Sequence, residues 1–384
     1  MKVVIAIDSL KGSLSSVEAG NAIKEGILRV NKEASVTIIP LADGGEGTVE
    51  ALVEGMNGEM QTLTVTGPLS ENVEAHYGIL PNSQTAIIEM AQAAGLPLVP
   101  SELRNPLNTT TYGVGEIIKE AIQKGCRHFV VGIGGSATND AGVGMLQALG
   151  FEFLDASGQL VGRGGRVLNE IAQVKTDGKL KELDECTFKI ACDVTNPLFG
   201  LNGAAHIYGP QKGATPEIVA ELDRGLVNFS EVVKKDLNLD LAHVPGVGAA
   251  GGLGYAFKAF LNGELESGID IIIKETNLES HLTDADFVIT GEGRLDQQTA
   301  MGKAPIGVTK LANKHGIKVI ALAGSLSDDA HHCNDAGMSA FFSIQKSPIP
   351  LTEAMKPEVA AKNMTDTTSQ IFKLISALDQ KRSV

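Results

Sequence analysis

The chain has 384 residues, of which 43% are hydrophobic and 20% charged, and a formal net charge of −14 at neutral pH. Its length predicts two domains, and its composition is typical of an ordinary globular protein. The acidic balance argues against nucleic acid or an anionic membrane as a general partner, because such partners are bound by a surplus of Lys and Arg.

The first part of the chain has the pattern of a β-α-β unit. The continuous apolar run at 2–8 predicts a buried strand, and residues 15–30 predict a helix. That helix opens with a capping box formed by Ser15 and Glu18, in which each side chain satisfies a free backbone donor. A second apolar run at 36–41 predicts the next strand.

The middle of the chain has a different texture. Between residues 61 and 90 apolar side chains alternate with others, which predicts an antiparallel meander. The alternating residues are Val73, Ala75, Tyr77 and Ile79. Two helices are predicted from apolar stripes at Val114, Ile117, Ile118, Ala121 and Ile122, and at Ile218, Leu222, Leu226, Phe229 and Val233. Thr215 and Pro216 suit the N-cap and the first position of the second helix.

The β-α-β pattern returns from about residue 268. Apolar runs predict three further strands, at 286–290, 318–324 and 340–344, and a last helix with Ile371, Leu374, Ile375 and Leu378 on one face. Five continuous apolar strands divided between the two ends of the chain favour one doubly wound (flavodoxin/Rossmann-like) sheet built from both termini. We therefore expect an α/β protein of two α/β domains. Residues 1–65 plus 265–384 would form the doubly wound domain, and 66–264 an inserted mixed α/β domain.

Polar, glycine-rich turns follow most of the predicted strands. They are DSLKGS at 8–13, ADGGEGT at 42–48, GIGGSATND at 132–140, CDVTNPLFG at 192–200, GPQKGA at 209–214 and TGEGRLDQQT at 290–299. In open α/β sheets the ligand lies beyond the carboxyl ends of the strands, and glycine lets backbone N–H groups approach an anion. Any one of these could be only a tight turn. Together, with their Asp, Glu, Lys, Arg and Ser residues, they predict a site for an anionic ligand.

The turn at 132–140 is compatible with two kinds of site. Its GxGxxA spacing after an apolar run matches a dinucleotide-binding fingerprint. However, the turn ends in Asp140, and a carboxylate beside a pyrophosphate is repulsive unless a cation lies between them. Hydroxyls, an amide and an acid around a glycine turn suit a metal-bound phosphate or a polyol better. Gly142 and Gly144 in the expected helix are also unexplained by a plain dinucleotide site.

The same motifs resemble those of the type-1 glycerate kinases. The resemblance rests on DSLKGSLSS at 8–16, ADGGEGT, RNPLNTTTYGVGE at 104–116, GIGGSATND, CDVTNPLFG, GPQKGA, GAAGGLG at 248–254 and ITGEGRLDQQTAMGKAPIGV at 289–308. These motifs run in order from residue 1 to about 345. There are two departures: Leu10, where an aromatic residue is common, and Ala141, where glycine often stands. Neither removes a functional group.

The resemblance implies an enzyme that transfers the γ-phosphoryl group of ATP to D-glycerate with Mg²⁺, in a branch of the family that forms 2-phosphoglycerate. Its partners would be these small molecules, with no nucleic acid and no membrane. No stretch reaches the roughly 18 apolar residues of a membrane helix, and the N-terminal apolar run is too short for a signal peptide. Four cysteines without CxxC spacing favour a cytoplasmic setting. The oligomeric state stays open, a homo-oligomer included.

Phosphoryl transfer depends on positioned charge, and the turns offer it. Lys11 and Lys212 stand beside glycines as candidate phosphate contacts. Arg294 has the planar fork that could hold the carboxylate of glycerate, unless Asp296 or Glu292 pairs with it. The candidate residues for ATP and its phosphates are Gly134, Gly135, Ser136, Lys212, Gly291 and Gly293. Those for the substrate are Ser9, Asp43, Glu46 and Arg294, and Asp43 and Glu46 could also contact Mg²⁺.

The attacking hydroxyl must lose its proton to a base, and Asp193 and Asp296 both stand just past predicted strands. Both are also candidate Mg²⁺ ligands, so the catalytic set is Asp193, Asp296, Lys11 and Arg294. An Asp in such a turn can instead cap backbone N–H groups. Arg294 lies two residues from Asp296 and would make it a poorer base, whereas Asp193 has no cation nearby in the sequence. We therefore favour Asp193 as the proton acceptor.

Other interpretations remain. An NAD(P)-dependent dehydrogenase of a small hydroxy acid fits the fingerprint but not Asp140, and a non-catalytic small-molecule binding protein would not need so many acids. A zinc site in SDDAHHCNDAG, at 327–337, is disfavoured because adjacent histidines rarely bind one ion and the stretch resembles a solvated loop. The chain has no GxxxxGK[ST] motif, which excludes a P-loop kinase.

Overall fold

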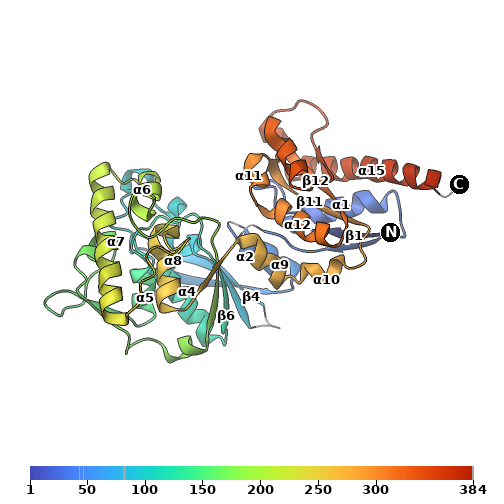
Figure 1. Cartoon of the computed structure of the whole chain (residues 1–384). Coiled ribbons are helices and arrows are strands. Elements are labelled where there is room, and N and C mark those ends of the chain that lie inside the picture. Colours follow the sequence, from blue (N-terminus) through green and yellow to red (C-terminus); the bar gives the residue numbers. More distant parts are fainter. Residues whose placement is uncertain (43, 46, 81–83, 383–384) are drawn as a thin grey trace. The chain divides into compact units, whose positions relative to one another are not determined.

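The computed structural model describes residues 1–42, 44, 45, 47–80 and 84–382, with side chains as far as residue 378. The chain divides into two compact units, whose elements are labelled in Figure 1. The first unit comprises Met1–Asp43, Glu50–Asn57 and Ile269–Val384. The second comprises Gly44–Val49 and Gly58–Gly268.

The first unit is built on a sheet of five parallel strands (Figure 1). The strands are β1 (Lys2–Ile5), β2 (Ser35–Ile38), β11 (Phe287–Leu295), β12 (Lys318–Leu326) and β13 (Ala340–Ser343). Their order in the sheet is β13-β12-β11-β1-β2, and every neighbouring pair is parallel. All five coincide with predicted apolar runs, so the prediction of one sheet drawn from both ends of the chain is confirmed.

Helices cover both faces of this sheet. The helices of the first unit are α1 (Ser16–Leu28), α2 (Thr48–Gly55), α9 (Gly268–Glu275), α10 (Leu278–Leu282), α11 (Gln297–Ala300), α12 (Ala304–Lys314), α13 (His332–Asp335), α14 (Leu351–Ala354) and α15 (Pro357–Arg382), with the 3₁₀ turn η6 (Asp328–His331). α1 and α15 pack on one face, over Ile5, Ile289 and Leu322. α12 packs on the other, over Ala321 and Ala323. Two apolar layers around a parallel sheet make the doubly wound arrangement.

α1 begins at the predicted capping box. The Ser15 hydroxyl accepts a hydrogen bond from the Glu18 backbone N–H (3.1 Å), and the Glu18 carboxylate accepts one from the Ser15 N–H (2.8 Å). α15 packs closely on this helix because Gly26 has no side chain. A Cβ at Gly26 would lie 2.6 Å from the carbonyl oxygen of Thr365, and Ser369 Oγ donates to the Gly26 carbonyl (3.0 Å).

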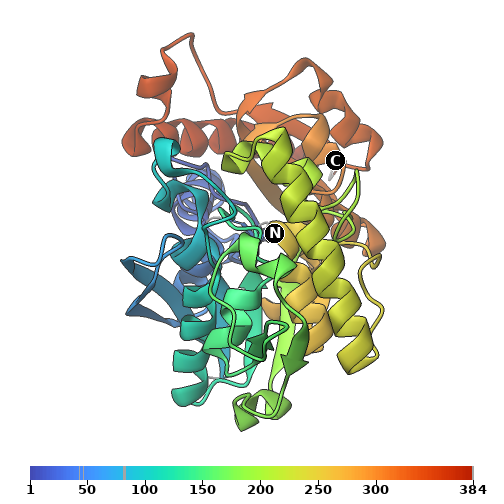
Figure 2. The ribbon, with the colours of Figure 1, turned by 90° about the vertical axis from the view of Figure 1, so that its left-hand side faces the viewer.

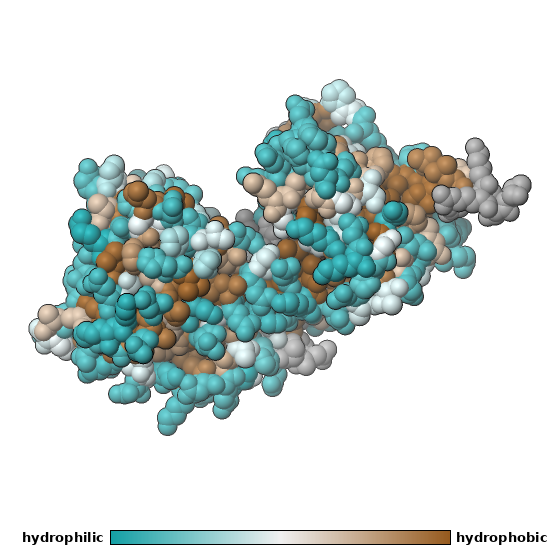
Figure 3. All heavy atoms as spheres, in the orientation of Figure 1, coloured by the Kyte–Doolittle hydropathy of each residue, from teal (hydrophilic) through white to brown (hydrophobic). Residues whose placement is uncertain are grey.

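The last turns of α15 expose part of their predicted apolar face. Ile371 is buried, but Leu374 and Leu378 are 61% and 55% exposed. Figure 3 shows the resulting apolar surface, in brown, at the C-terminal end of the chain. Ile375 is partly buried against the core of the first unit, so the helix packs through Ile371 and Ile375 and exposes the rest of the predicted stripe.

The second unit contains a six-stranded mixed sheet in the order β10-β9-β6-β5-β4-β3. Its strands are β3 (Glu59–Thr66), β4 (Asn72–Leu80), β5 (Thr85–Glu89), β6 (His128–Gly132), β9 (Thr187–Ala191) and β10 (Glu264–Glu266), and a separate pair is formed by β7 (Glu152–Leu154) and β8 (Gln173–Lys175). The antiparallel pairs β3–β4 and β4–β5 confirm the predicted meander, and β5, β6, β9 and β10 are parallel.

The limits of the second unit differ from the expected 66–264. β3 pairs with β4 along its whole length, which brings the residues from 58 into this unit. β10 pairs with β9 and extends the unit to 268. The strand pairing, which the apolar pattern does not report, accounts for these two shifts. Gly44–Val49 also belongs to the second unit instead of the doubly wound domain. The Val49 N–H donates a hydrogen bond to the carboxylate of Glu89 on β5 (3.0 Å).

The helices of the second unit are α3 (Ala91–Ala94), α4 (Tyr112–Gln123), α5 (Val143–Ala148), α6 (Ala204–Tyr208), α7 (Pro216–Leu237) and α8 (Ala249–Phe260), with 3₁₀ turns η1 (Leu96–Leu98), η2 (Ser101–Leu103), η3 (Gly165–Asn169), η4 (Lys181–Glu185) and η5 (Pro210–Lys212). α7 begins at Pro216, and its N-cap Thr215 accepts from the Ile218 N–H (3.4 Å), as predicted. Figure 2 shows α7, in yellow-green, on the side of the unit that faces the viewer. The stripe predicted on α4 is buried throughout, and that on α7 from Leu222 onward.

Candidate active site

The carboxyl ends of the five parallel strands of the first unit meet at one edge of its sheet. The strand order reverses between β1 and β11, and sheets of this order bind ligands at that edge, outside the point of reversal. A cavity of about 340 Å³ lies there, among residues that end or follow β1, β11, β12 and β13. Its polar lining consists of Asp8, Ser9, Lys11, Ser13, Glu292, Arg294, Asp296, Lys303, Ser325 and Gln345. We call this cavity the sheet-edge cleft.

The sheet-edge cleft gathers charges of both signs. Its cations are Lys11, Arg294 and Lys303, and its carboxylates are Asp8, Glu292 and Asp296. Five of the residues predicted from the sequence line it together: Ser9, Lys11, Gly293, Arg294 and Asp296. The cations can each bind an anionic group of a ligand directly, and the carboxylates can hold a proton or a metal ion.

Asp8 holds the turn that carries Ser9 and Lys11. Its side chain is buried, and its Oδ1 accepts a hydrogen bond from the Ser9 N–H (2.6 Å). Its own backbone N–H donates to the carbonyl of Gly291 on the neighbouring strand (3.0 Å). The turn after β1 is thus fixed to β11 at the wall of the cleft.

Gly291 lies within β11 and is not among the lining residues of the cleft. Its φ is 153°, and a Cβ there would lie 1.8 Å from the carbonyl oxygen of Leu322 on β12. Close approach of the two strands therefore explains this glycine. Gly293, two residues further on, does line the cleft.

Asp296 is the N-cap of α11. Its Oδ1 accepts a hydrogen bond from the Thr299 N–H (3.1 Å), and the Thr299 hydroxyl donates to Glu292 Oε1 (2.5 Å). Asp296 therefore caps a backbone N–H group, which is the structural role that was weighed against a catalytic one. This role occupies one carboxylate oxygen, and the side chain still lines the cleft.

Arg294 does not form the ion pair that the sequence suggested. Within the described residues its guanidinium has no ion pair or hydrogen bond with Asp296, Glu292 or any other side chain. Asp296 was expected to be the poorer base because the Arg294 guanidinium would lie against it. In the described part of the chain that contact is not formed. The preference for Asp193 as the proton acceptor stays a prediction.

In the second unit, the turn after β6 lies over a buried lysine. Gly134 and Gly135 are exposed, whereas Ser136 is buried. Lys212 is 2% exposed, and its Nζ donates to Ser136 Oγ and to the carbonyl of Thr138, both at 2.7 Å. Four predicted phosphate-binding residues therefore lie together, as an exposed glycine turn with an amino group beneath it.

Lys212 should make stability depend on pH. Burial lowers its pKa to about 7 from 10.5, and the charge of Asp140 opposes that shift. Between these values the unfolded chain binds more protons than the native one, so the contribution of Lys212 to stability rises with pH. We expect the unfolding free energy of the natural chain relative to Lys212→Met to rise by up to about 1.4 kcal/mol per pH unit above pH 7. Urea titrations across this range measure it.

The matched control is Lys119→Met, which removes an exposed lysine of α4. Its effect on the unfolding free energy should stay flat over the same pH range. A flat difference for Lys212→Met as well would mean that Lys212 titrates like a solvated lysine.

Asp140 is a structural residue of the same turn. It is fully buried, and its Oδ2 accepts hydrogen bonds from the Thr111 N–H (2.8 Å), the Thr111 hydroxyl (2.9 Å) and the Gly144 N–H (3.3 Å). Its Oδ1 accepts from the Gly142 N–H (3.1 Å). Burial raises the pKa of Asp140, and these hydrogen bonds oppose the rise. The expectation that this carboxylate faces a metal-bound phosphate or a polyol is wrong, because its partners are groups of the protein.

Close packing explains the glycines near Asp140. Gly142 has φ 72° and precedes α5, and a Cβ on Gly144 would lie 2.2 Å from Thr110 Oγ1. Ala141 has φ 49°, a backbone conformation that glycine adopts more readily, and its N–H donates to the carbonyl of Gly251 (3.0 Å). Ala141, which stands where the resembling family often has glycine, therefore has a strained backbone conformation.

Asp193 follows β9 at its carboxyl end. It is exposed, and its Oδ1 accepts a hydrogen bond from the Gly268 N–H (3.0 Å). β9 is the parallel neighbour of β6, so Asp193 and the Gly134–Ser136 turn lie at the same edge of the second sheet. The other two predicted substrate contacts, Asp43 and Glu46, lie outside the described residues.

Sequence reasoning missed several lining residues of the sheet-edge cleft: Asp8, Glu292, Lys303, Ser325 and Gln345. Their position in the sequence could have indicated them. Asp8 follows the apolar run of β1, and Ser325 lies at the end of the apolar run of β12, a strand of the same sheet. In the second unit, Thr138 and Asn139 are further candidates because of their unsatisfied polar atoms. Both are fully buried, and their side-chain polar atoms have no hydrogen-bond partner within the described residues. Such groups often mark functional sites.

None of the helices in the described part of the chain is long and apolar enough to span a membrane. The family model described as the glycerate kinase family matches residues 3–376. The chain is 49% identical to glycerate 2-kinase of Escherichia coli K12, over 93% of each chain. It is 45% identical to glycerate kinase of Halalkalibacterium halodurans, over 96% of this chain and 98% of the relative. A crystal structure from Salmonella typhimurium LT2, carrying the name glycerate kinase 2, matches with a TM-score of 0.92 and 44% identity over 99% of each chain.

Proposed function

Since the chain belongs to the glycerate kinase family and is by that membership a phosphotransferase, we propose that it transfers the γ-phosphoryl group of ATP to a hydroxyl of D-glycerate. The sheet-edge cleft is the observation that carries this proposal. Its three cations can bind a carboxylate and a phosphoryl group, and its three carboxylates can hold Mg²⁺ or a proton. Phosphoryl transfer requires both positioned substrates and charges that neutralise the transferred group.

Within the cleft, Arg294 suits the carboxylate of D-glycerate. Its guanidinium is free of ion pairs with the described residues, and its planar fork can donate two parallel hydrogen bonds to a carboxylate. Ser9 can donate a hydrogen bond to a glycerate hydroxyl, and Lys11 can neutralise charge on the transferred phosphoryl group. The roles proposed for Asp43 and Glu46 as substrate contacts rest on their sequence motif.

For ATP, the exposed turn at Gly134 and Gly135 offers backbone N–H groups, with Ser136 and the Lys212 amino group beneath them. A phosphate near this turn would favour the charged form of Lys212, which burial otherwise disfavours. Gly293 lines the sheet-edge cleft and can let a phosphate approach the backbone there. For Gly291, strand packing is the better supported role.

The cleft also offers suitable ligands for Mg²⁺. Asp8, Glu292 and Asp296 supply carboxylate oxygens, the donor type that Mg²⁺ prefers. Asp296 uses only Oδ1 in its helix cap, so its second oxygen has no partner within the described residues. We therefore propose Asp296 as a ligand, and Asp193 as a further candidate in the second unit. Bound Mg²⁺ would neutralise charge on the β- and γ-phosphates of ATP.

D-Glycerate and ATP are the proposed partners, and both are anionic. The net charge of −14 leaves no general surplus of cations for nucleic acid. The four cysteines are free thiols, which suits a reducing cytoplasm as the place of the reaction.

The test of this function combines turnover with binding. The purified full chain should form ADP from Mg²⁺-ATP only when D-glycerate is present, in an assay coupled to ADP. Mg²⁺-ATP should also raise its thermal midpoint, because a ligand that binds only the native state stabilises it. Stabilisation by NAD(P) without glycerate-dependent ADP formation would favour the dehydrogenase. Stabilisation by D-glycerate alone, without turnover, would favour a binding protein.

We expect 2-phosphoglycerate as the product. The 49% identical relative from Escherichia coli is named glycerate 2-kinase, which supports transfer to the 2-hydroxyl. The check is to add enolase, without a mutase, to the completed reaction. 2-Phosphoglycerate is then converted directly to phosphoenolpyruvate, whose absorbance is followed. A product that enolase converts only after phosphoglycerate mutase is added would be 3-phosphoglycerate.

A further inference from the structure

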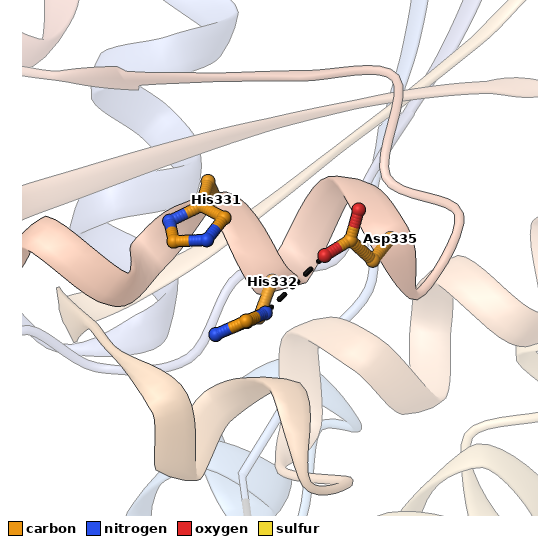
Figure 4. A group of neighbouring side chains, drawn as sticks. All are labelled: His331, His332 and Asp335. Carbon is orange, nitrogen blue, oxygen red and sulfur yellow. Dashed lines mark hydrogen bonds and ion pairs between the residues drawn. The ribbon is translucent and has the colours of Figure 1, made fainter.

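A group of metal-binding side chains lies outside the sheet-edge cleft. His331 is the last residue of η6, and His332 and Asp335 are the first and last residues of α13. The three side chains therefore belong to two consecutive short helices that follow β12. One donor atom from each comes within 4.8 Å of the other two. His332 Nδ1 and Asp335 Oδ2 are 3.2 Å apart, and the two imidazole centroids are 4.2 Å apart (Figure 4). The proposed phosphoryl transfer uses none of these side chains.

The geometry answers the objection that adjacent histidines rarely share an ion. His331 Nδ1 lies 3.0 Å from the carbonyl oxygen of Asp328, to which it can donate a hydrogen bond. That bond places the proton of a neutral ring on Nδ1 and leaves the Nε2 lone pair available. Metal-binding histidines typically have such a backbone or carboxylate partner for the other ring nitrogen.

The segment points these donors toward solvent and anchors itself from the other side. Cys333 is buried in an apolar cluster with Ala330 and Met338. The side chains of His332 and Asp335 are 44% and 74% exposed. Donors about 2.0–2.2 Å from one ion lie roughly 3–4 Å from each other, so the group has to contract only by about 1 Å. Exposed side chains can make that movement by small rotations.

We propose that His331, His332 and Asp335 bind one divalent transition-metal ion of the zinc class, with water completing its coordination. Two imidazole nitrogens and one carboxylate are ligands that Zn²⁺, Ni²⁺ and Cu²⁺ prefer, whereas Mg²⁺ prefers oxygen ligands alone. Asp328 and Asp329 add two more carboxylate side chains to the same segment. The surroundings thus favour a cation.

The site is separate from the sheet-edge cleft but lies on a neighbouring element. η6 and α13 pack against α11, whose N-cap Asp296 lines the cleft. An ion held by His331 on η6 and by His332 and Asp335 on α13 would fasten these two short helices together. We therefore expect the ion to stabilise this part of the first unit.

The test is a calorimetric titration of the chelator-treated full chain with ZnCl₂, in excess MgCl₂ and without ATP. We expect one Zn²⁺ to bind per chain and to raise the thermal midpoint. Co²⁺ at the same site should give the visible absorption of a four-coordinate ion. His331→Ala and Asp335→Asn should each weaken Zn²⁺ binding roughly tenfold or more, and the double variant His331→Ala/His332→Ala should abolish it. Circular dichroism would confirm that each variant is folded.

The matched control is His315→Ala. His315 and Glu279 also form an accessible histidine–carboxylate pair, at 3.1 Å, but they belong to no three-donor group within the described residues. This variant should bind Zn²⁺ like the natural chain. Equal Zn²⁺ binding by the natural chain and the double variant would overturn the proposal, as would the absence of Zn²⁺ binding by the natural chain. All variants should keep the Mg²⁺-ATP-dependent rate, so this result does not depend on the proposed kinase reaction.

Discussion

Replacing Asp193 with asparagine is expected to lower kcat roughly 10²–10⁴-fold, with little change in the KM for ATP. Asparagine has the same shape and keeps an oxygen that can accept the Gly268 N–H, so the local structure should survive. It cannot accept the proton of the attacking hydroxyl. Steady-state kinetics with each substrate varied in turn measure the effect, and circular dichroism checks the fold.

Asp296→Asn is the partner experiment. Asparagine is also a good N-cap, so α11 should keep its first turn. We expect this variant to raise a KM or the Mg²⁺ concentration needed for half-maximal rate. If instead Asp296→Asn loses kcat and Asp193→Asn changes only a KM or the Mg²⁺ requirement, the two roles are exchanged.

Arg294→Ala is expected to lower kcat/KM for D-glycerate roughly 10²–10³-fold, with little effect on the KM for ATP. Two charge-assisted hydrogen bonds to the substrate carboxylate contribute about 3–4 kcal/mol together, which corresponds to this factor. Arg294→Lys should recover only part of the loss, because an ammonium keeps the charge but not the fork.

Arg224→Ala, at an exposed position on α7 in the second unit, is the matched control and should leave the kinetics unchanged. Equal KM values for D-glycerate in Arg294→Ala and the natural chain would remove Arg294 from the substrate site. A defect shared equally between the ATP and glycerate KM values would point to a role in phosphate binding instead.

The sequence was a good guide wherever local pattern and burial coincide. Fully buried parallel strands appear as unbroken apolar runs, so the five strands of the first unit could be located and assigned to one sheet. The capping box at Ser15 and the cap at Thr215 are equally local, and both are present. The unit limits could not be read in this way. Whether residues 59–66 join one sheet or the other depends on pairing with β4, a non-local contact.

For the candidate site, too, some residues could be predicted from the sequence and others could not. Ser9, Lys11, Gly293, Arg294 and Asp296 were expected to meet because the carboxyl ends of parallel strands share one edge, and they line one cleft. The burial of Asp140 could not be foreseen, because a buried helix-capping carboxylate and a ligand-facing one have the same sequence context. Likewise, proximity of Arg294 and Asp296 in sequence did not produce an ion pair, since side chains two residues apart need not meet.

Phosphorus NMR can follow the proposed phosphoryl transfer from ATP to D-glycerate while it takes place. The spectrum follows ATP, ADP, inorganic phosphate and phosphate esters at once, while the purified chain acts on D-glycerate and Mg²⁺-ATP. We expect a single phosphate monoester that grows in step with ADP, and unchanged ATP when D-glycerate is left out. Intact ATP in the presence of D-glycerate, or ADP and inorganic phosphate without any ester, would contradict the proposed transfer.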